Sequence, residues 1–289
     1  MGRTIACGVS LALRLCLFVH REGDAVDTVM VDGLRIAYER TGAGPALVLL
    51  HGYVADGPTT WRRQLDELCD EFTVVAWDAP GAGGSSDPPL GFGMVDYVDC
   101  LAGFVDALGL DRPNVVGLSF GGSLALAAQG RRVAVARALV LASAYAGWGG
   151  SLSADIAEAR LQQAFVLADL SPDEFVEALL PSMFSSAVSA DTVAAFRSSM
   201  LEFHRVGFRA LARAAAENLR YVLPRVQVPT LLVYGEHDVR APLPVAWDLE
   251  AAITGARLVV LPGVGHLCNL EAPDEFNGAV RTFLHDTIT

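Results

Sequence analysis

The stretch NVVGLSFGG, residues 114–122, decides the fold predicted for this chain. It places the pattern G-x-S-x-G, with Ser119 at its centre, directly after an apolar run and directly before a helix-like segment. A serine held on a sharp turn from a strand to a helix needs small neighbours, because the turn strains the backbone and packs its flanks tightly. Gly117 and Gly121 meet that need. The stretch therefore predicts a nucleophile elbow that presents the Ser119 hydroxyl at the edge of a sheet.

Short apolar or β-branched runs alternate with longer helix-like stretches on both sides of this turn. Such alternation predicts an α/β fold, in which helices cover both faces of a twisted, mostly parallel sheet. The first two runs are separated by Asp32-Gly33, a two-residue turn that accepts positive φ angles and therefore predicts a hairpin. The expected strands are 28–31, 34–40, 46–50, 73–77, 114–118, 138–143, 230–234 and 257–261.

The strand pattern disappears between residues 148 and 221, where an Ala-rich, helix-like segment takes its place. The sequence Ser171-Pro172-Asp173-Glu174 is a capping box with proline in the first turn, which marks the start of one of several short helices. We therefore expect a helical cap domain at 148–221, inserted into a core formed by 26–147 and 222–289. Residues 1–25 precede the first strand pattern and are expected to form an N-terminal extension.

The charge of the chain bears on its partners. With 21 Lys and Arg against 33 Asp and Glu, the net charge is −12, and no basic block stands out. A nucleic-acid partner is therefore not expected, because binding to a phosphate backbone needs clustered positive charge. After the first twenty residues no apolar run approaches the roughly 20 residues that span a bilayer, so no stable membrane span is expected. The sequence leaves the oligomeric state open.

The N-terminus and the cysteines bear on the compartment. Thr4–Val19 is an apolar stretch after Arg3, as in a signal segment, but Arg14 interrupts it and no small-x-small cleavage site follows. We expect a cytoplasmic protein, with export as the alternative. Five scattered cysteines without a C-x-x-C pair indicate neither a disulfide framework nor a zinc site. Neither a metal nor a cofactor is expected.

A second glycine-containing loop, His51-Gly52-Tyr53, directly follows the expected strand 46–50. An oxyanion hole needs two N–H donors that converge from different segments. Gly52 lets the backbone turn so that the Tyr53 amide supplies one donor, and the Phe120 amide, at the positive end of the helix after Ser119, supplies the other. His51 is explained more simply as a hydrogen-bonded residue that shapes the loop than as a catalytic one.

A serine hydroxyl becomes a strong nucleophile when a base removes its proton, so a histidine held by a carboxylate is expected. Of the six histidines, His266 lies in a glycine-rich loop between the last expected strand and the last expected helix, where an imidazole can reach the sheet edge. The loop at 235–242, after the strand 230–234, offers two candidate acids, Glu236 and Asp238.

From about Val31 to the C-terminus the chain resembles the α/β-hydrolase superfamily. The resemblance covers the loop at His51, DAPGAGGS at 78–85, the elbow, the loop at 235–238 and Gly265-His266. The order of serine, acid and histidine is also the order of that superfamily. The resemblance implies that Ser119, Asp238 and His266 form a catalytic triad. The strand that ends at Ser143 carries no carboxylate for the alternative acid position of some relatives, which supports Asp238.

The helical insertion and the ending GHLCNLEAP, residues 265–273, resemble 3-oxoadipate enol-lactonases and related small esterases. Similar endings occur in meta-cleavage C–C hydrolases, cofactor-free perhydrolases and haloalkane dehalogenases. Dehalogenases and epoxide hydrolases of this fold have an aspartate at the elbow, where this chain has Ser119. A serine alkoxide beside an oxyanion hole favours attack on a carbonyl carbon.

The expected function is therefore a serine esterase, one that cleaves a carboxylic ester, lactone or thioester of a small acyl substrate through an acyl-enzyme. C–C bond hydrolysis or perhydrolysis by the same triad is one alternative, and a non-catalytic ligand-binding member of the fold is another. His51, Trp148 and Met200 are candidates for the lining of the substrate pocket.

Overall fold

The computed structural model describes residues 26–131, 135–185 and 188–288. Strands occur at all eight expected positions and form one sheet in the order β1-β2-β4-β3-β5-β6-β7-β8. The antiparallel pairs are β1 with β2 and β2 with β4, and the remaining neighbours are parallel. The strands are β1 (Asp27–Val31), β2 (Leu34–Thr41), β3 (Ala46–Leu50), β4 (Thr73–Trp77), β5 (Asn114–Leu118), β6 (Leu139–Ala142), β7 (Thr230–Gly235) and β8 (Arg257–Leu261).

Burial along each strand follows its place in the sheet. The central strands β4, β5, β6 and β7 are buried at every residue, as continuous apolar runs covered on both faces should be. The edge strands β1 and β8 expose several residues. Between β1 and β2, Asp32 and Gly33 have φ angles of 46° and 83°, which confirms the predicted two-residue hairpin turn.

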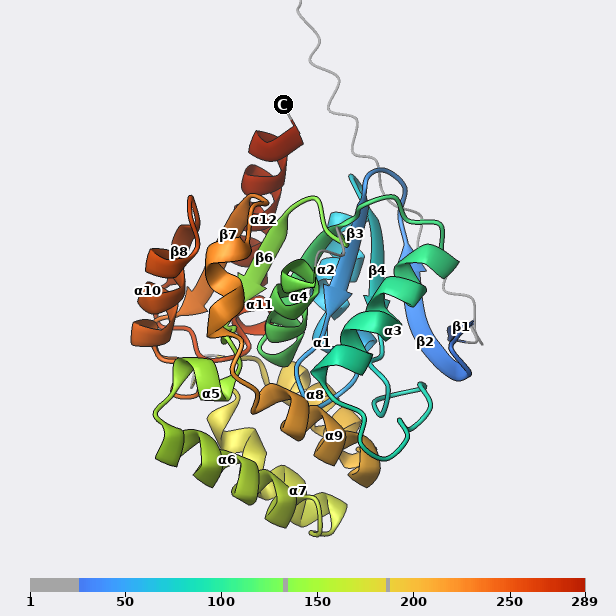
Figure 1. Ribbon diagram of the computed structural model, residues 1–289, viewed down its shortest axis with the longest axis vertical. Coiled ribbons are helices and arrows are strands. Elements are labelled where there is room, and N and C mark those ends of the chain that lie inside the picture. The colour runs from blue at the N-terminus through green and yellow to red at the C-terminus, as the bar shows by residue number, and fades with distance from the viewer. Residues whose placement is uncertain (1–25, 132–134, 186–187, 289) are drawn as a thin grey trace, which may run out of the picture.

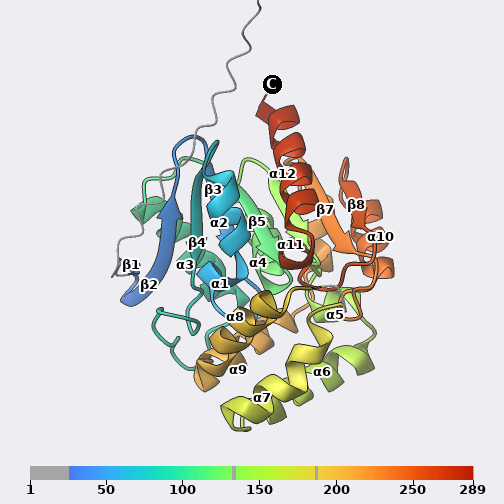
Figure 2. The ribbon, with the colours of Figure 1, turned by 180° about the vertical axis from the view of Figure 1, so that it is seen from behind.

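Helices cover both faces of the sheet, as expected for an α/β fold (Figures 1 and 2). One face carries α3 (Met94–Ala107), α4 (Phe120–Gly130) and α10 (Leu243–Ala252). The other carries α2 (Arg62–Leu68) and α12 (Pro273–Ile288), with the short helices α1 (Gly57–Thr60) and α11 (Cys268–Glu271) at their ends. In the part of the chain that the structure describes, no helix is both long enough and apolar enough to cross a bilayer.

Between β6 and β7 the described residues form helices and no strand. These helices lie together beyond the carboxyl ends of the parallel strands (Figure 1). The predicted capping box is present, since the Ser171 amide donates to Glu174 Oε2 at 3.0 Å and the Ser171 hydroxyl accepts from the Glu174 amide. The helices are α5 (Trp148–Ser151), α6 (Ala154–Leu167), α7 (Pro172–Leu179), η1 (Leu180–Ser182), α8 (Ala190–Leu201), α9 (Arg205–Ala215) and η2 (Arg220–Arg225).

Two contacts join these helices to the loops at the sheet edge. Asp56, the N-cap of α1, accepts a hydrogen bond from the Ser199 hydroxyl of α8, and the Ser199 oxygen in turn accepts from the Asp56 amide at 3.0 Å. Gly81 and Gly207 pack backbone against backbone, so that a Cβ on either residue would overlap the other. The helical segment is therefore fixed against the same loops that surround the elbow.

Candidate active site

Ser119 lies on the turn between β5 and α4 and is 5% exposed. Its backbone has a φ of 52° and a ψ of −109°, a conformation that a residue with a side chain rarely adopts. Its amide donates a 2.8 Å hydrogen bond to the carbonyl of Ala142 at the end of β6. The neighbouring strand β6 therefore helps to hold this backbone conformation. The conformation directs the serine side chain away from the line of β5.

The two glycines of G-x-S-x-G are required because other backbone lies against them. A Cβ on Gly117 would overlap the backbone of Gly121, and a Cβ on Gly121 would overlap the carbonyl oxygens of Leu50 and His51. None of these atoms belongs to a flexible side chain that can move aside. The motif therefore brings the end of β3 and the start of α4 into direct backbone contact.

Gly121→Ala is expected to destabilise the protein by at least about 3 kcal/mol, because the added methyl group meets rigid backbone. Gly278→Ala is the matched control, since Gly278 lies in α12 and a Cβ there would meet no atom within 4 Å. That control should gain about 0.5–1 kcal/mol from the helix propensity of alanine. Urea unfolding monitored by circular dichroism measures both, and equal stabilities of the two variants would contradict the packing described for the elbow.

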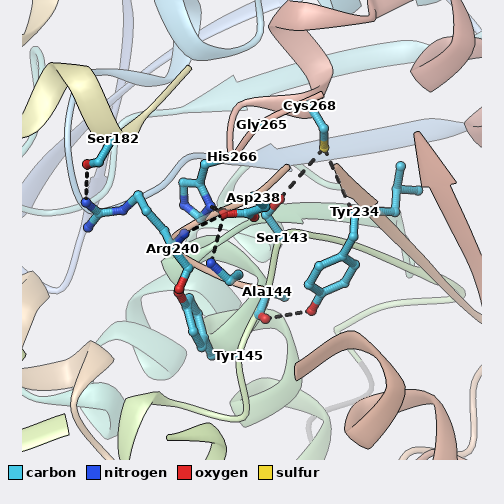
Figure 3. A network of polar contacts seen from close by, with 12 residues as sticks. Ser143, Ala144, Tyr145, Ser182, Tyr234, Asp238, Arg240, Gly265, His266 and Cys268 are labelled. Carbon is cyan, nitrogen blue, oxygen red and sulfur yellow. Dashed lines mark hydrogen bonds and ion pairs between the residues drawn. The ribbon is translucent and has the colours of Figure 1, made fainter. Parts of the chain in front are cut away.

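The histidine and the acid are paired in the structure. His266 Nδ1 lies 2.9 Å and 3.0 Å from the two carboxylate oxygens of Asp238, and both side chains are buried (Figure 3). Asp238 follows β7, and His266 follows β8 in the loop before α11. Strand pairing of β7 with β8 brings these two loops to the same edge of the sheet.

The electrostatic environment keeps Asp238 ionised. Burial alone would raise the pKa of this carboxyl group. Coulombic attraction to His266 and hydrogen bonds from His266, the Ala241 amide and the Ser143 hydroxyl outweigh that effect, so the pKa lies below its ordinary value. An ionised Asp238 fixes Nδ1 of His266 as the protonated nitrogen and leaves Nε2 free to act as a base.

Ser119 and His266 line one cavity. Apart from His266, its wall contains no side chain that carries a charge. Two of the lining residues, Met183 and Phe196, come from the helical segment between β6 and β7. The lining residues are Gly52, Tyr53, Val54, Thr60, Leu118, Ser119, Met183, Phe196, His266 and Leu267.

The two expected oxyanion donors lie on the segments that meet at Ser119. Phe120 is the first residue of α4, so its amide is free of intrahelical hydrogen bonds and lies at the positive end of the helix. Gly52 precedes Tyr53, and a Cβ on Gly52 would lie 3.8 Å from the Ser119 Cβ, an ordinary van der Waals distance. Both donor-bearing segments are therefore within reach of an oxygen atom held beside Ser119.

The model of the alpha/beta hydrolase family matches residues 47–279, which contain every residue of this site. The chain belongs to that family. It is 30% identical over 263 residues to "Serine hydrolase BPHL" of Mus musculus, covering 89% of this chain and 85% of that protein.

Solved structures of alpha/beta hydrolases resemble the chain over nearly its whole length. A thermophilic esterase from Thermogutta terrifontis matches with a TM-score of 0.82 and 29% identity, covering 91% of this chain and 98% of the esterase. The enol-lactonase from Burkholderia xenovorans matches with a TM-score of 0.79 and 26% identity, covering 90% of this chain and all of that one. The expected α/β-hydrolase fold and the resemblance to esterases and enol-lactonases are thus confirmed.

Within this alpha/beta hydrolase, His51, Trp148 and Met200 are not among the residues that line the cavity at Ser119 and His266. Nε2 of His51 accepts a 2.9 Å hydrogen bond from the Ala79 amide, and burial lowers the pKa of His51 to about 4. A neutral, fully buried imidazole therefore shapes the loop. Trp148 packs edge-on against the ring of Tyr53, and Met200 is completely buried in α8.

The remaining described histidines have partners away from the cavity. His204 Nδ1 lies 2.8 Å from Asp87, and His285 Nε2 lies 2.6 Å from Glu71. His237 is largely exposed and faces Glu236 at 4.0 Å. His20 lies outside the described residues, as does the segment Thr4–Val19. Within the described ranges, no three His, Cys, Asp or Glu side chains are grouped so as to hold a metal ion.

Two further residues, which were not predicted from the sequence, hold the loops that carry Asp238 and His266. Glu271 Oε2 accepts hydrogen bonds from the amide of Gly265, the residue before His266, at 3.1 Å, and from the amide of Ser185 at 2.9 Å. Arg240 donates from its backbone amide to Asp238 Oδ1 at 2.8 Å. Glu271 lies five residues after His266, and Arg240 lies two residues after Asp238. No local sequence pattern indicates which atoms they contact.

Proposed function

We propose that the protein is a serine hydrolase that cleaves a carboxylic ester, lactone or thioester of a small substrate through an acyl-enzyme. The observation that carries the proposal is the lining of one cavity by Ser119, on its strained turn, and by His266, whose Nδ1 is held by the buried Asp238. Three residues from the ends of three parallel strands thus converge, as nucleophilic catalysis by serine requires.

In the proposed reaction, His266 Nε2 takes the proton of the Ser119 hydroxyl as the oxygen attacks the carbonyl carbon. The Tyr53 and Phe120 amides donate hydrogen bonds to the oxyanion that forms. His266 then gives its proton to the leaving oxygen or sulfur, which departs and leaves an acyl-enzyme. Water, deprotonated by His266, attacks the ester carbon, and the collapse of the second tetrahedral intermediate returns the proton to Ser119 and releases the acid.

The cavity supports a small and mostly apolar acyl group. Its wall is mostly apolar around the reacting groups, as in ordinary ligand pockets. We propose that the segment 148–221 acts as a cap domain on the core of 26–147 and 222–289, because Met183 and Phe196 of this segment line the same cavity as Ser119. The cap would then select the substrate.

An active-site label tests the proposal directly. A fluorophosphonate should modify the chain once, at Ser119, and p-nitrophenyl acetate should be hydrolysed with a burst of p-nitrophenol equal to one equivalent per labelled site. Tandem mass spectrometry locates the adduct. Labelling at another residue would contradict the assignment, and labelling at Ser119 without turnover of any ester, lactone or thioester would favour a ligand-binding role. A dienoic diketo acid and peracid formation, tested in parallel, identify C–C hydrolysis and perhydrolysis.

A further inference from the structure

A second cavity lies beside the catalytic one and is lined by neither Ser119 nor His266. The two cavities have Tyr53 and Val54 in common. Tyr53 has the larger side chain of these two shared residues. The residues that line the second cavity are Tyr53, Val54, Ala55, Asp56, Gly81, Ala82, Gly83, Ser199, Glu202, Phe203, His204, Phe208 and Leu211.

The Tyr53 side chain is clamped in its place between the cavities. Its ring stacks on Phe208 of α9 at a centroid distance of 5.2 Å and meets the edge of Trp148 at 5.5 Å. Its hydroxyl accepts a 2.6 Å hydrogen bond from Nη2 of Arg240, whose Nη1 donates to the Ser182 hydroxyl of η1 at 2.8 Å (Figure 3 shows the bond to Ser182). The two ring contacts and the hydrogen bond at its hydroxyl therefore fix the position of the ring.

The position of the second cavity indicates which half of a substrate would extend into it. The leaving group must lie beside His266, because His266 gives it a proton. Of the two cavities, only the catalytic one is lined by His266. A chain that passed the Tyr53 ring would therefore run away from His266. Since the leaving group lies on the side of His266, the half of the substrate that extends away from His266 is the acyl group.

We propose that the Tyr53 ring is a partition that limits the substrates to esters of short acyl chains by closing off the second cavity. This inference rests on the proposed function, because it assigns the acyl group to the catalytic cavity. Without the ring the two cavities would join through the space that the Tyr53 side chain occupies. Phe203, Phe208 and Leu211 make much of the second cavity apolar, whereas Asp56 and Glu202 disfavour an acyl tail that ends in a carboxylate.

The test compares p-nitrophenyl octanoate with p-nitrophenyl acetate. Tyr53→Ala should raise the ratio of their kcat/KM values by at least about tenfold, since a pocket that accepts extra methylenes discriminates by that factor or more. Tyr53→Phe retains the ring and should keep the wild-type ratio, although it loses the bond to Arg240. Leu211→Phe, added to Tyr53→Ala, refills the second cavity and should return the ratio toward the wild-type value. Thermal melts establish that each variant is folded, and Tyr53→Val replaces Tyr53→Ala where the latter does not fold.

A binding measurement separates this inference from the proposed function. Octanamide needs no turnover, and calorimetry should detect its binding to Tyr53→Ala at a concentration where the wild type binds none. If the wild type neither hydrolyses esters nor reacts with a fluorophosphonate, the proposed function is wrong, while octanamide still reports on the partition. A folded Tyr53→Ala variant with an unchanged ratio and no octanamide binding would overturn the partition, as would an equal shift in Tyr53→Phe.

Discussion

Ser119→Ala is expected to lower kcat for p-nitrophenyl acetate by about 10⁵-fold or more, to the level of residual catalysis by the oxyanion donors and substrate binding. The change removes the attacking oxygen, and without it no acyl-enzyme forms. The affinity for the substrate should change little, because the alanine methyl group occupies most of the space of the serine side chain. Stopped-flow measurement of the p-nitrophenol burst, together with steady-state rates, separates the chemical step from binding.

Ser123→Ala is the matched control for this prediction. Ser123 is also a buried serine on α4, four residues after Ser119, but its hydroxyl donates to the carbonyl of Tyr145 at 2.9 Å and does not line the catalytic cavity. Its removal should cost about 1 kcal/mol of stability and leave the burst intact. A burst that survives in Ser119→Ala, or disappears in Ser123→Ala at full folding, would contradict the assignment of the nucleophile.

The sequence predicted the positions of the strands well, because each is a short apolar or β-branched run bounded by turn residues. The buried strand β5 and the Asp32-Gly33 hairpin are both fixed by local chemistry. The expected strand 138–143 is shorter in the structure, Leu139–Ala142, since Ser143 has already turned to a positive φ of 45°. Unlike Ser119, Ser143 lies in no G-x-S-x-G pattern that would indicate its positive φ from the sequence.

The lining of the pocket was much harder to predict than the triad. Ser119 and His266 lie in glycine-rich loops at strand ends, where chain order and local pattern constrain them. The surroundings of the cavity depend instead on how distant segments pack, such as Tyr53 with Arg240, and Gly265 with Glu271 and Ser185. Trp148, expected in the lining, is instead buried against Tyr53, and no sequence pattern indicates which neighbour its ring contacts.

The identity of the acid was left between two residues by the sequence alone, and their surroundings separate them. Asp238 is 4% exposed and pairs with His266. The side chain of Glu236 is 51% exposed, and its Oε2 accepts a 3.0 Å hydrogen bond from the Gly263 amide. An exposed carboxylate is screened by water and can neither orient an imidazole firmly nor stabilise its cation strongly.

Asp238→Asn is therefore expected to lower kcat by about 10⁴-fold while the fold persists. The asparagine oxygen can still accept from the Arg240 and Ala241 amides, which both bond to Oδ1 of Asp238 at 2.8 Å. The new amide group then faces Nδ1 of His266 as a donor. The imidazole must accept there, so its proton moves to Nε2 and the nitrogen that should act as the base toward Ser119 is blocked.

Glu236→Gln serves as the control, because the glutamine oxygen can still accept from Gly263 and its carboxylate has no place in the proposed reaction. Its kcat should stay near that of the wild type. Asp238→Asn should also show little change in KM, because it alters the tautomer of His266 and leaves the lining of the cavity unchanged. Comparable losses in the two variants, or a larger loss in Glu236→Gln, would exclude Asp238 as the residue that orients the base. A large loss confined to Asp238→Asn, with both melting curves intact, would place the orienting charge in the buried pair and not at the surface.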